Sequence, residues 1–323
     1  MFFCSLISFE NLKTISIIHH KFSVKAAALT LCLSSGFFAV QAQTSNTELF
    51  KSSAFTPLKS FPSGVEGPAV STSGIVYAVN FGKQGTIGQI TPTGDASLFV
   101  TLPAGSIGNG IRFNSKGEMF IADYTKHNIL KVNMATKEVS VFAHNPKMSQ
   151  PNDIAIDNKD RLYASDPNWK ASAGRIWRID TNGWFKLLDT MGTANGIEVS
   201  PDNKLLYVNE SVQRKVWVYD LSADGDVSNK RIFHEFPDFG MDGMRCDIDG
   251  NLYIARHGKG TVVKLSPAGK VLEEVTLLGK LPSNVAFGGS DGRTVYVTLQ
   301  DNGNLESFRV DKPGREWNMQ KQK

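Results

Sequence analysis

Six polar residues recur at nearly constant intervals along most of the chain, each just ahead of a short apolar segment. Their spacings are 43, 43, 43, 47 and 42 residues, and the residues are Glu66, Asn109, Asn152, Asn195, Asp242 and Asn284. All six side chains offer oxygen donors, which a hard cation such as Ca²⁺ prefers, whereas Zn²⁺ prefers His and Cys. If the fold gathers them, they predict a metal site. The alternative is that Asn and Asp only form turns at strand starts.

The segments around these six residues predict β-strands. Each polar residue is followed by an apolar run, a turn of Asp, Asn, Ser and Gly, and a second run of β-branched and aromatic residues. Third and fourth alternating runs follow in most units, for example at residues 175–180 and 184–188. Alternation with a period of two indicates strands, and no long helical periodicity follows residue 42.

Six such units of about 43 residues predict an all-β fold, a six-bladed β-propeller with four-stranded blades. The first strand of each blade would line the central channel, so the six polar residues would form a ring around its axis. The last unit supplies only three strands, and we expect residues 55–61 to close the ring as its outer strand. Residues after 310 are polar, and we expect them to form a loose tail.

Composition narrows the classes of partner. The 323 residues carry a formal charge of +4, and 41% of them are hydrophobic, which is enough for a folded core. No cluster of Lys and Arg stands out, which argues against a nucleic-acid partner. Three cysteines exclude a disulfide-stapled miniprotein, and we expect Cys246 to be a small buried hydrophobic residue. The sequence indicates no particular oligomeric state.

Residues 1–42 predict a cleaved signal peptide. Residues 26–40 are apolar or small, they follow Lys21 and Lys25, and small residues stand at the expected cleavage point. The apolar run is too short to span a bilayer comfortably. We therefore expect a propeller over residues 43–323 of a secreted or periplasmic protein, without membrane association after cleavage. The stretch before the apolar run is long, so the true start of translation could lie further in, near Lys21.

Several motifs are shared with a known family. They are Glu66-Gly67-Pro68 in the first unit, Asn195-Gly196-Ile197 in the fourth, and the stretches at 242–271 and 281–298. On these residues the chain resembles the senescence marker protein, gluconolactonase and luciferin-regenerating enzyme family, over nearly all of the part after residue 42.

The resemblance implies a six-bladed propeller with one divalent metal in its channel. The matching positions make Glu66, Asn195 and Asp242 its protein ligands, with Asn152 as a fourth ligand or a substrate contact. The oxygen donors of the ring favour Ca²⁺, and the sequence leaves Zn²⁺, Mn²⁺ and Mg²⁺ open. Asn284 would face the axis without binding the metal.

The resemblance further implies hydrolysis of lactones or related esters. A metal would polarise the carbonyl group, and Asp242 would accept the proton of the attacking water. Asp166 and Glu210 are alternative bases. Asn109 and His257 are candidate substrate contacts, and His257 could also carry protons.

One difference from the family pattern and one missing motif narrow the range of substrates and mechanisms. Sugar-lactone members often carry Arg two places before Asn152, whereas this chain has Gln150. That difference argues against a sugar-acid lactone and leaves a less polar lactone or ester open. The chain also lacks a Gly-x-Ser-x-Gly elbow, which argues against a serine hydrolase.

Two other functions compete with a lactonase. One is a non-hydrolytic propeller enzyme similar to strictosidine synthase, although such enzymes typically lack the full metal set that this chain keeps. The other is a binding propeller that holds its metal for structure or ligand capture. Glu66 and Asp242 fit either a hydrolase or a binding propeller, and only turnover separates the two.

Overall fold

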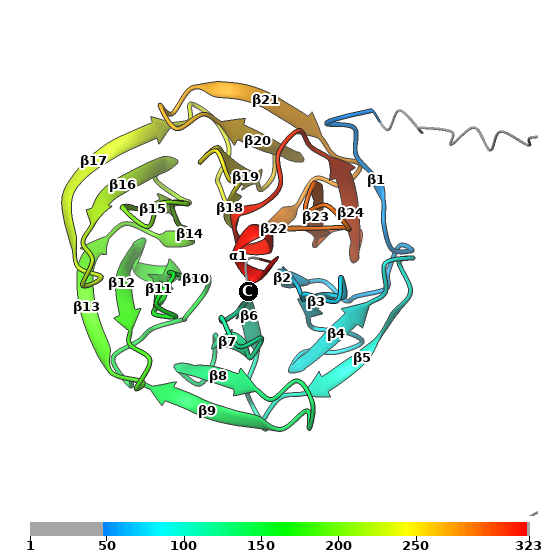
Figure 1. The fold of residues 1–323 in the computed structure, drawn as a ribbon, viewed down its shortest axis with the longest axis horizontal. Helices are drawn as coiled ribbons and strands as arrows, with labels where there is room; N and C mark the ends of the chain where they lie inside the picture. Colours follow the sequence, from blue (N-terminus) through cyan, green and yellow to red (C-terminus); the bar gives the residue numbers. More distant parts are fainter. Residues whose placement is uncertain (1–47, 322–323) are drawn as a thin grey trace, which may run out of the picture. The chain divides into compact units, whose positions relative to one another are not determined.

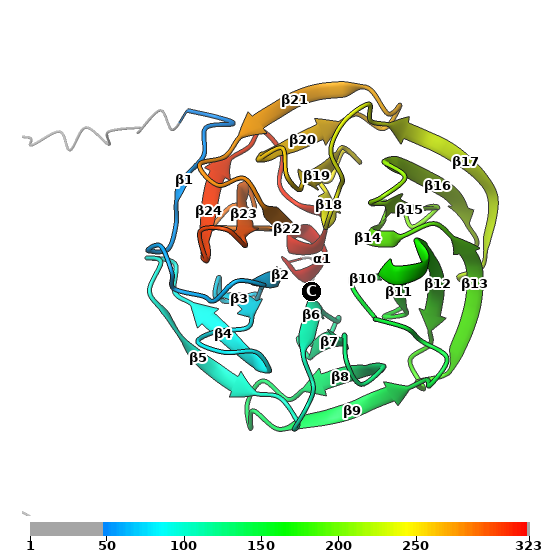
Figure 2. The same cartoon turned by 180° about the vertical axis from the view of Figure 1, so that it is seen from behind.

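The structure, a computed structural model, describes residues 48–321, which form a six-bladed β-propeller (Figures 1 and 2). The predicted signal peptide lies outside the described residues. Within residues 48–321, no helix is both long enough and apolar enough to cross a bilayer.

Each blade is a four-stranded antiparallel sheet whose strands run in chain order from the channel outwards, except that the sixth blade takes its outer strand from the N-terminal side. The strands of blades 1 to 3 are β2 (Glu66–Val70), β3 (Val76–Val79), β4 (Thr86–Ile90), β5 (Ala96–Thr101), β6 (Gly108–Phe113), β7 (Met119–Asp123), β8 (Asn128–Val132), β9 (Val139–His144), β10 (Ile154–Ile156), β11 (Leu162–Asn168), β12 (Ala173–Ile179) and β13 (Phe185–Met191). Those of blades 4 to 6 are β14 (Ala194–Val199), β15 (Leu205–Glu210), β16 (Lys215–Leu221), β17 (Val227–Glu235), β18 (Met244–Cys246), β19 (Leu252–Arg256), β20 (Thr261–Leu265), β21 (Val271–Thr276), β22 (Pro282–Gly288), β23 (Thr294–Leu299), β24 (Asn304–Arg309) and β1 (Ser53–Ala54).

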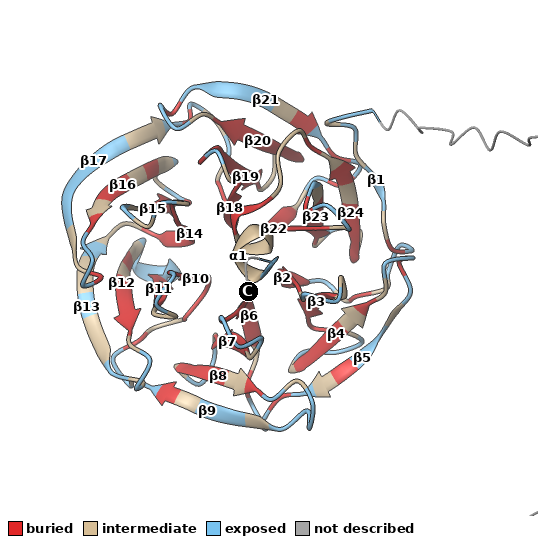
Figure 3. Ribbon diagram, viewed as in Figure 1, coloured by how far each residue is buried: buried red, intermediate tan, exposed pale blue. Residues whose placement is uncertain are grey.

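The core lies between blades, because the apolar side chains of each sheet pack against those of the next. One cluster joins Tyr77 of blade 1 to Phe113 of blade 2, and another joins Tyr253 of blade 5 to Phe287 of blade 6. The three inner strands of each blade are largely buried, whereas the outer strands are more exposed (Figure 3). Cys246 is buried in one of these clusters, as expected.

An N-terminal strand closes the ring, as predicted, but it is shorter and earlier than expected. It is β1, in which Ser53 pairs with Ser307 and Ala54 with Glu306 of β24. The expected segment 55–61 continues along the same edge through single backbone bonds, such as that from the Phe61 amide to the Gly303 carbonyl. Pro57 has no amide hydrogen to donate, so a regular ladder does not extend through this segment.

The expectation of a loose C-terminal tail is wrong. Residues Arg315–Lys321 form helix α1, which lies at the centre of the ring (Figures 1 and 2). Residues 313–321 contact all six blades: the partners, in blade order, are Val70, Arg112, Ile156, Glu198, Ile248 and Gly289. Most of these partners lie near the turns between first and second strands. The helix therefore closes the channel at the end where those turns lie.

Candidate active site

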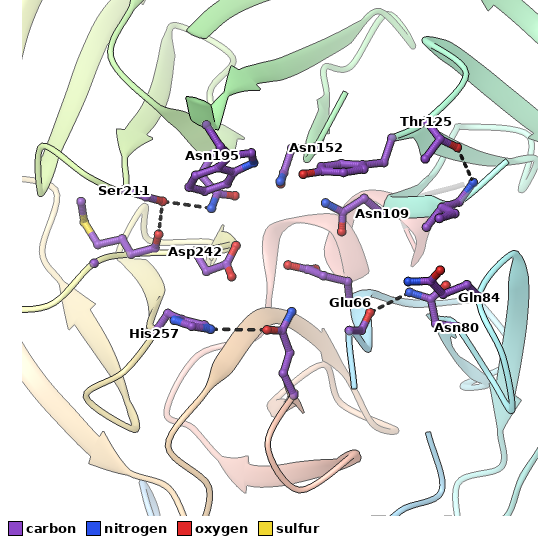
Figure 4. A pocket seen from close by; sticks show the side chains of 18 residues that line it. Glu66, Asn80, Gln84, Asn109, Thr125, Asn152, Asn195, Ser211, Asp242 and His257 are labelled. Atoms are coloured by element: carbon purple, nitrogen blue, oxygen red, sulfur yellow. Dashed lines mark hydrogen bonds between the residues drawn. The ribbon is translucent and has the colours of Figure 1, made fainter. Parts of the chain in front are cut away.

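The channel opens into a cavity of about 480 Å³ at the end opposite α1 (Figure 4). Five of the six regularly spaced polar residues line it, and we call these five the inner ring: Glu66, Asn109, Asn152, Asn195 and Asp242. The sixth, Asn284, is buried and does not line the cavity, although it lies close enough to Glu66 to lower the pKa of that carboxyl. The sequence-predicted metal, base and carboxamide substrate positions thus converge on one space.

Irregular strand starts aim the inner ring into the channel. In blades 1, 2 and 4 the pairing register between the first two strands shifts at the inner-ring residue. Such bulges redirect a side chain that regular alternation would place elsewhere. In blades 3 and 5 the residue lies just before the strand, where backbone bonds to the second strand hold it, as from the Asp242 amide to the Ala255 carbonyl.

Glycine after an inner-ring residue lets neighbouring blades approach closely. A Cβ atom on Gly67, which has a φ of +54°, would lie 1.8 Å from the Asn109 carbonyl oxygen. A Cβ atom on Gly243 would lie 1.9 Å from the Asn284 side chain. No larger residue fits at either position, so the residue after the polar one sets the narrow diameter of the ring.

A second set of side chains forms the cavity mouth, and sequence reasoning identified only one of them. In every blade, the residue directly after the second strand lines the cavity. We call these six the outer ring: Asn80, Tyr124, Trp169, Ser211, His257 and Gln300. They share a position and not a chemical type, so a search for recurring residue types misses five of them. The signal that could have pointed to them is their common place, directly after the second strand of each blade.

Two carboxylates dominate the electrostatics of the cavity. Burial, followed by the charge of Asp153, raises the pKa of Glu66 to about 7. Burial and the charge of Glu66 raise the pKa of Asp242 well above its ordinary value. Because each carboxylate is costly to ionise beside the other, the pair favours either a shared proton or a cation between them.

The donor set fits a hard cation. Among residues 48–321, no three His, Cys, Asp or Glu side chains gather closely enough to hold a metal by themselves. Carboxamide oxygens must therefore complete any site built on Glu66 and Asp242. Asn195 is suited to this, because its amide nitrogen donates to the Ser211 hydroxyl at 3.0 Å while its Oδ1 atom, although buried, finds no hydrogen-bond partner among the described residues.

An aromatic wall lines one side of the mouth. Trp169 begins the short 3₁₀ helix η1 (Trp169–Ala171), which Asn168 caps by accepting the Ala171 amide. Trp169 lies close enough to Tyr124 to influence the pKa of its hydroxyl, and both residues line the cavity. Among the residues that the structure describes, no Lys or Arg lines the cavity. Besides the two carboxylates and His257, the walls therefore offer ring faces, carboxamides and hydroxyls, and no Lys or Arg that could pair with an anionic substrate.

Comparison with known proteins agrees with this architecture. Residues 65–301 match the SMP-30/Gluconolactonase/LRE-like region family. The chain belongs to this family. A relative in the family, a gluconolactonase from Zymomonas mobilis, is 25% identical over 287 residues, which cover 76% of this chain and 80% of that protein.

A 6-deoxy-6-sulfogluconolactonase from Pseudomonas putida is 32% identical over 168 residues, which cover 49% of this chain and 57% of that protein. This second alignment thus spans little more than half of the relative. Among solved structures, the calcium-binding protein regucalcin from Agrobacterium tumefaciens superimposes with a TM-score of 0.70 at 20% identity, over 82% of this chain and 97% of that one. That likeness supports the fold.

Of the remaining predicted site residues, one lines the cavity and two lie outside it. His257 lines the cavity, and its Nε2 atom lies 3.4 Å from Oε1 of Gln300. Asp166 and Glu210, the alternative bases, lie outside the cavity lining. Asp166 accepts the amides of Ser149 and Gln150, and Glu210 accepts the Gly192 amide. Both carboxylates therefore act as backbone caps at strand ends.

Proposed function

We propose that this protein is a cation-dependent lactonase that hydrolyses small uncharged lactones, with related esters as secondary substrates. The observation that carries the proposal is the convergence of Glu66, Asn195 and Asp242 on one cavity in a chain of the gluconolactonase family. The relatives named gluconolactonase and 6-deoxy-6-sulfogluconolactonase support lactone hydrolysis. Regucalcin's description as a calcium-binding protein supports Ca²⁺ as the cation.

Glu66, Asn195 and Asp242 would hold the cation, with Asn152 as a fourth ligand. When bound, a divalent cation supplies Lewis-acid polarisation of a carbonyl group. The two carboxylates balance its charge, and the unpartnered Oδ1 atom of Asn195 gains a partner. The raised pKa values of Glu66 and Asp242 show how strongly this pair disfavours a charged, cation-free state.

The residues of the chain then have separate tasks in hydrolysis. Asp242 accepts a proton from water as the water oxygen bonds to the lactone carbonyl carbon. The bond between that carbon and the ring oxygen breaks, and the proton passes to the departing alkoxide, so the product is an open-chain hydroxy acid. Asn109 binds a substrate oxygen, and Trp169 offers a ring face in the cavity wall against which an apolar part of the substrate packs.

The cavity walls favour an uncharged substrate. Because the two carboxylates already balance the charge of the cation, an anionic group would find no further positive partner among Lys and Arg side chains, none of which lines the cavity among the described residues. An unpaired charge in such a cavity is disfavoured. Gln150 is uncharged and does not line the cavity, and its backbone amide donates to Asp166. The position where sugar-lactone members often carry Arg therefore adds no positive charge here.

The test is a panel of lactones and esters, offered to chelated protein with each of Ca²⁺, Mg²⁺, Mn²⁺ and Zn²⁺. We expect turnover of neutral lactones with Ca²⁺, and kcat/KM lower by at least about tenfold for lactones of equal size that carry a carboxylate or sulfonate. No turnover with any cation would favour a binding propeller instead.

We also propose that the protein is exported and acts outside the cytoplasm. The support is the basic, apolar and small-residue order of residues 1–42. After removal of this segment Cys246 is the remaining thiol, so an oxidising compartment leaves nothing to pair within the chain. N-terminal sequencing of the protein from the periplasm or medium tests this, and a mature protein that begins at residue 43 is the expected result.

A further inference from the structure

A buried charge cluster lies beneath the candidate site, between the inner ring and helix α1. Its members come from four blades and from the helix. They are three arginines, Arg112, Arg245 and Arg315, and three acids, Asp153, Glu198 and Glu316. All except Glu316 are at most 2% exposed. Three of them, Arg112, Glu198 and Arg245, stand three positions after an inner-ring residue, so the strands that build the site also build the cluster.

Helix α1 provides one positive and one negative charge of this cluster. Arg315 lies 3.3 Å from Glu198, and Glu316 lies 2.5 Å from Nε of Arg112. The helix thus supplies ion-pair partners for two buried groups, Arg112 and Glu198, and its withdrawal removes both partners. A buried charged group that loses its partner is costly.

The cluster connects the helix to the inner ring through Asp153. Arg112 and Arg245 hold the two oxygens of Asp153, at 3.4 and 3.0 Å. Asp153 directly follows Asn152, and the pair is fixed to Ser165 by the bond from the Asn152 amide to the Ser165 carbonyl at 2.9 Å. A path of contacts therefore runs from Glu316 through Arg112 and Asp153 to an inner-ring residue.

We propose that Glu316 and Arg315 are positioning residues of the candidate site. The helix that carries them closes the far end of the channel, and Glu316, through Arg112 and Asp153, fixes Asn152 in the cavity wall. Hydrogen bonds alone do not satisfy the buried arginines of this cluster, so they depend on their ion pairs. Nε and Nη2 of both Arg112 and Arg245 lack hydrogen-bond partners among the described residues, so the ion pair of Glu316 with Nε of Arg112 supplies charge balance at a guanidinium that hydrogen bonds leave partly unsatisfied.

The thiol of Cys246 can report whether helix α1 stays in place at the closed end of the channel. Cys246 is 1% exposed on β18, and the next residue, Asp247, pairs with Gly314 at the base of the helix. Arg315 and Glu316 lie close enough to influence the charge of its thiol. Departure of the helix therefore opens a route from solvent to this sulfur, and a thiol reagent measures that opening without any substrate.

The test compares Glu316→Gln and a chain ending at Gly314 with the matched control Glu138→Gln, an exposed acid far from the cluster. All proteins carry Cys4→Ser and Cys32→Ser, so that Cys246 is the single thiol. Three quantities are measured: the rate at which an aromatic disulfide modifies Cys246, Ca²⁺ affinity by calorimetry, and global stability in urea. The calcium readout rests on the proposed function, whereas modification of Cys246 does not.

We expect Glu316→Gln to weaken Ca²⁺ binding by about three- to tenfold, less than the loss of a direct partner of a metal ligand would, because Glu316 acts through Arg112 and Asp153. Cys246 should react faster than the change in global stability accounts for, and the chain ending at Gly314 should show a larger effect. Wild-type affinity in Glu316→Gln, or Cys246 reactivity that follows global unfolding alone, overturns the proposal. If the wild type binds no Ca²⁺, the proposed cation fails and Cys246 modification alone decides this inference.

Discussion

Glu66 and Asp242 come from blades 1 and 5, 176 positions apart in the chain, yet the charge of Glu66 raises the pKa of Asp242. Both carboxylates line the same cavity. Because these two buried acids influence each other's ionisation, the charge of the site depends on whether protons or a cation are bound there.

The first prediction concerns pH. The folded-state pKa of Glu66, about 7, lies above its ordinary value of 4.5, so between these values the cation-free folded protein holds a proton that the unfolded chain has lost. Its stability therefore falls as the pH rises through this window. Ca²⁺ binds the ionised pair, so the stabilisation by Ca²⁺ should grow as the pH rises from 5 to 8. Melting temperatures measured with chelator and with Ca²⁺ check this.

Glu198 needs a control in that experiment, because burial raises its pKa to about 7 as well. Its contribution is the same with and without Ca²⁺, so it cancels in the difference between the two melting curves. A gain from Ca²⁺ that is equal at pH 5 and pH 8 would contradict the assignment of Glu66 as a ligand.

The second prediction separates the two carboxylates. Asp242→Asn keeps an oxygen donor but removes the candidate base, and we expect kcat to fall by about 10²–10⁴ even at saturating Ca²⁺. Glu66→Gln should act through cation affinity, so excess Ca²⁺ should restore much of its activity. Steady-state kinetics over a range of Ca²⁺ concentrations distinguishes them. Full restoration of Asp242→Asn would leave Asp242 as a ligand only, with His257 as the remaining ionisable candidate base in the cavity.

The third prediction distinguishes two asparagines of the inner ring. Asn195→Ala removes the unpartnered oxygen, so it should weaken Ca²⁺ binding by at least about tenfold. Asn109→Ala should raise KM and leave Ca²⁺ affinity near that of the wild type. Calorimetry and kinetics on both variants give the comparison. Equal losses of Ca²⁺ affinity in the two would show that the inner ring binds its cation more symmetrically than we propose.

The fourth prediction tests the aromatic wall. Trp169→Ala should raise KM about fivefold for lactones with an apolar face, because contact with a ring that is 38% exposed in the free protein stabilises the bound lactone by about 1 kcal/mol. Trp184→Ala is the matched control, since Trp184 is 59% exposed and is not part of the cavity lining. An equal rise of KM in both variants would remove Trp169 from the substrate site.

The repeated pattern predicted the blades and the inner ring well, because strand alternation and turn residues are local signals. A recurrence every 42 to 47 residues puts Glu66, Asn195 and Asp242 at equivalent points of three blades, and all three line one cavity. Helix α1 could not be predicted in the same way. It has seven residues, and contacts such as that of Arg315 with Glu198, 117 positions away, hold it in place. Apart from His257, the outer ring could not be predicted from recurring residue types, because its members share a position in the blade and differ in chemistry.

The blade that completes the ring has a consequence for the order of folding. Ser53 and Ser307 pair across 254 positions of the chain, so a ribosome makes β1 long before its partner strand exists. Closing so long a loop is slow relative to local hairpin formation. Until then the nascent protein is an open arc, and after β24 emerges that strand has an unpaired edge until β1 docks. β1 is thus made before all the other strands but can pair only after β24, and translation must pass residue 309 before the ring can close.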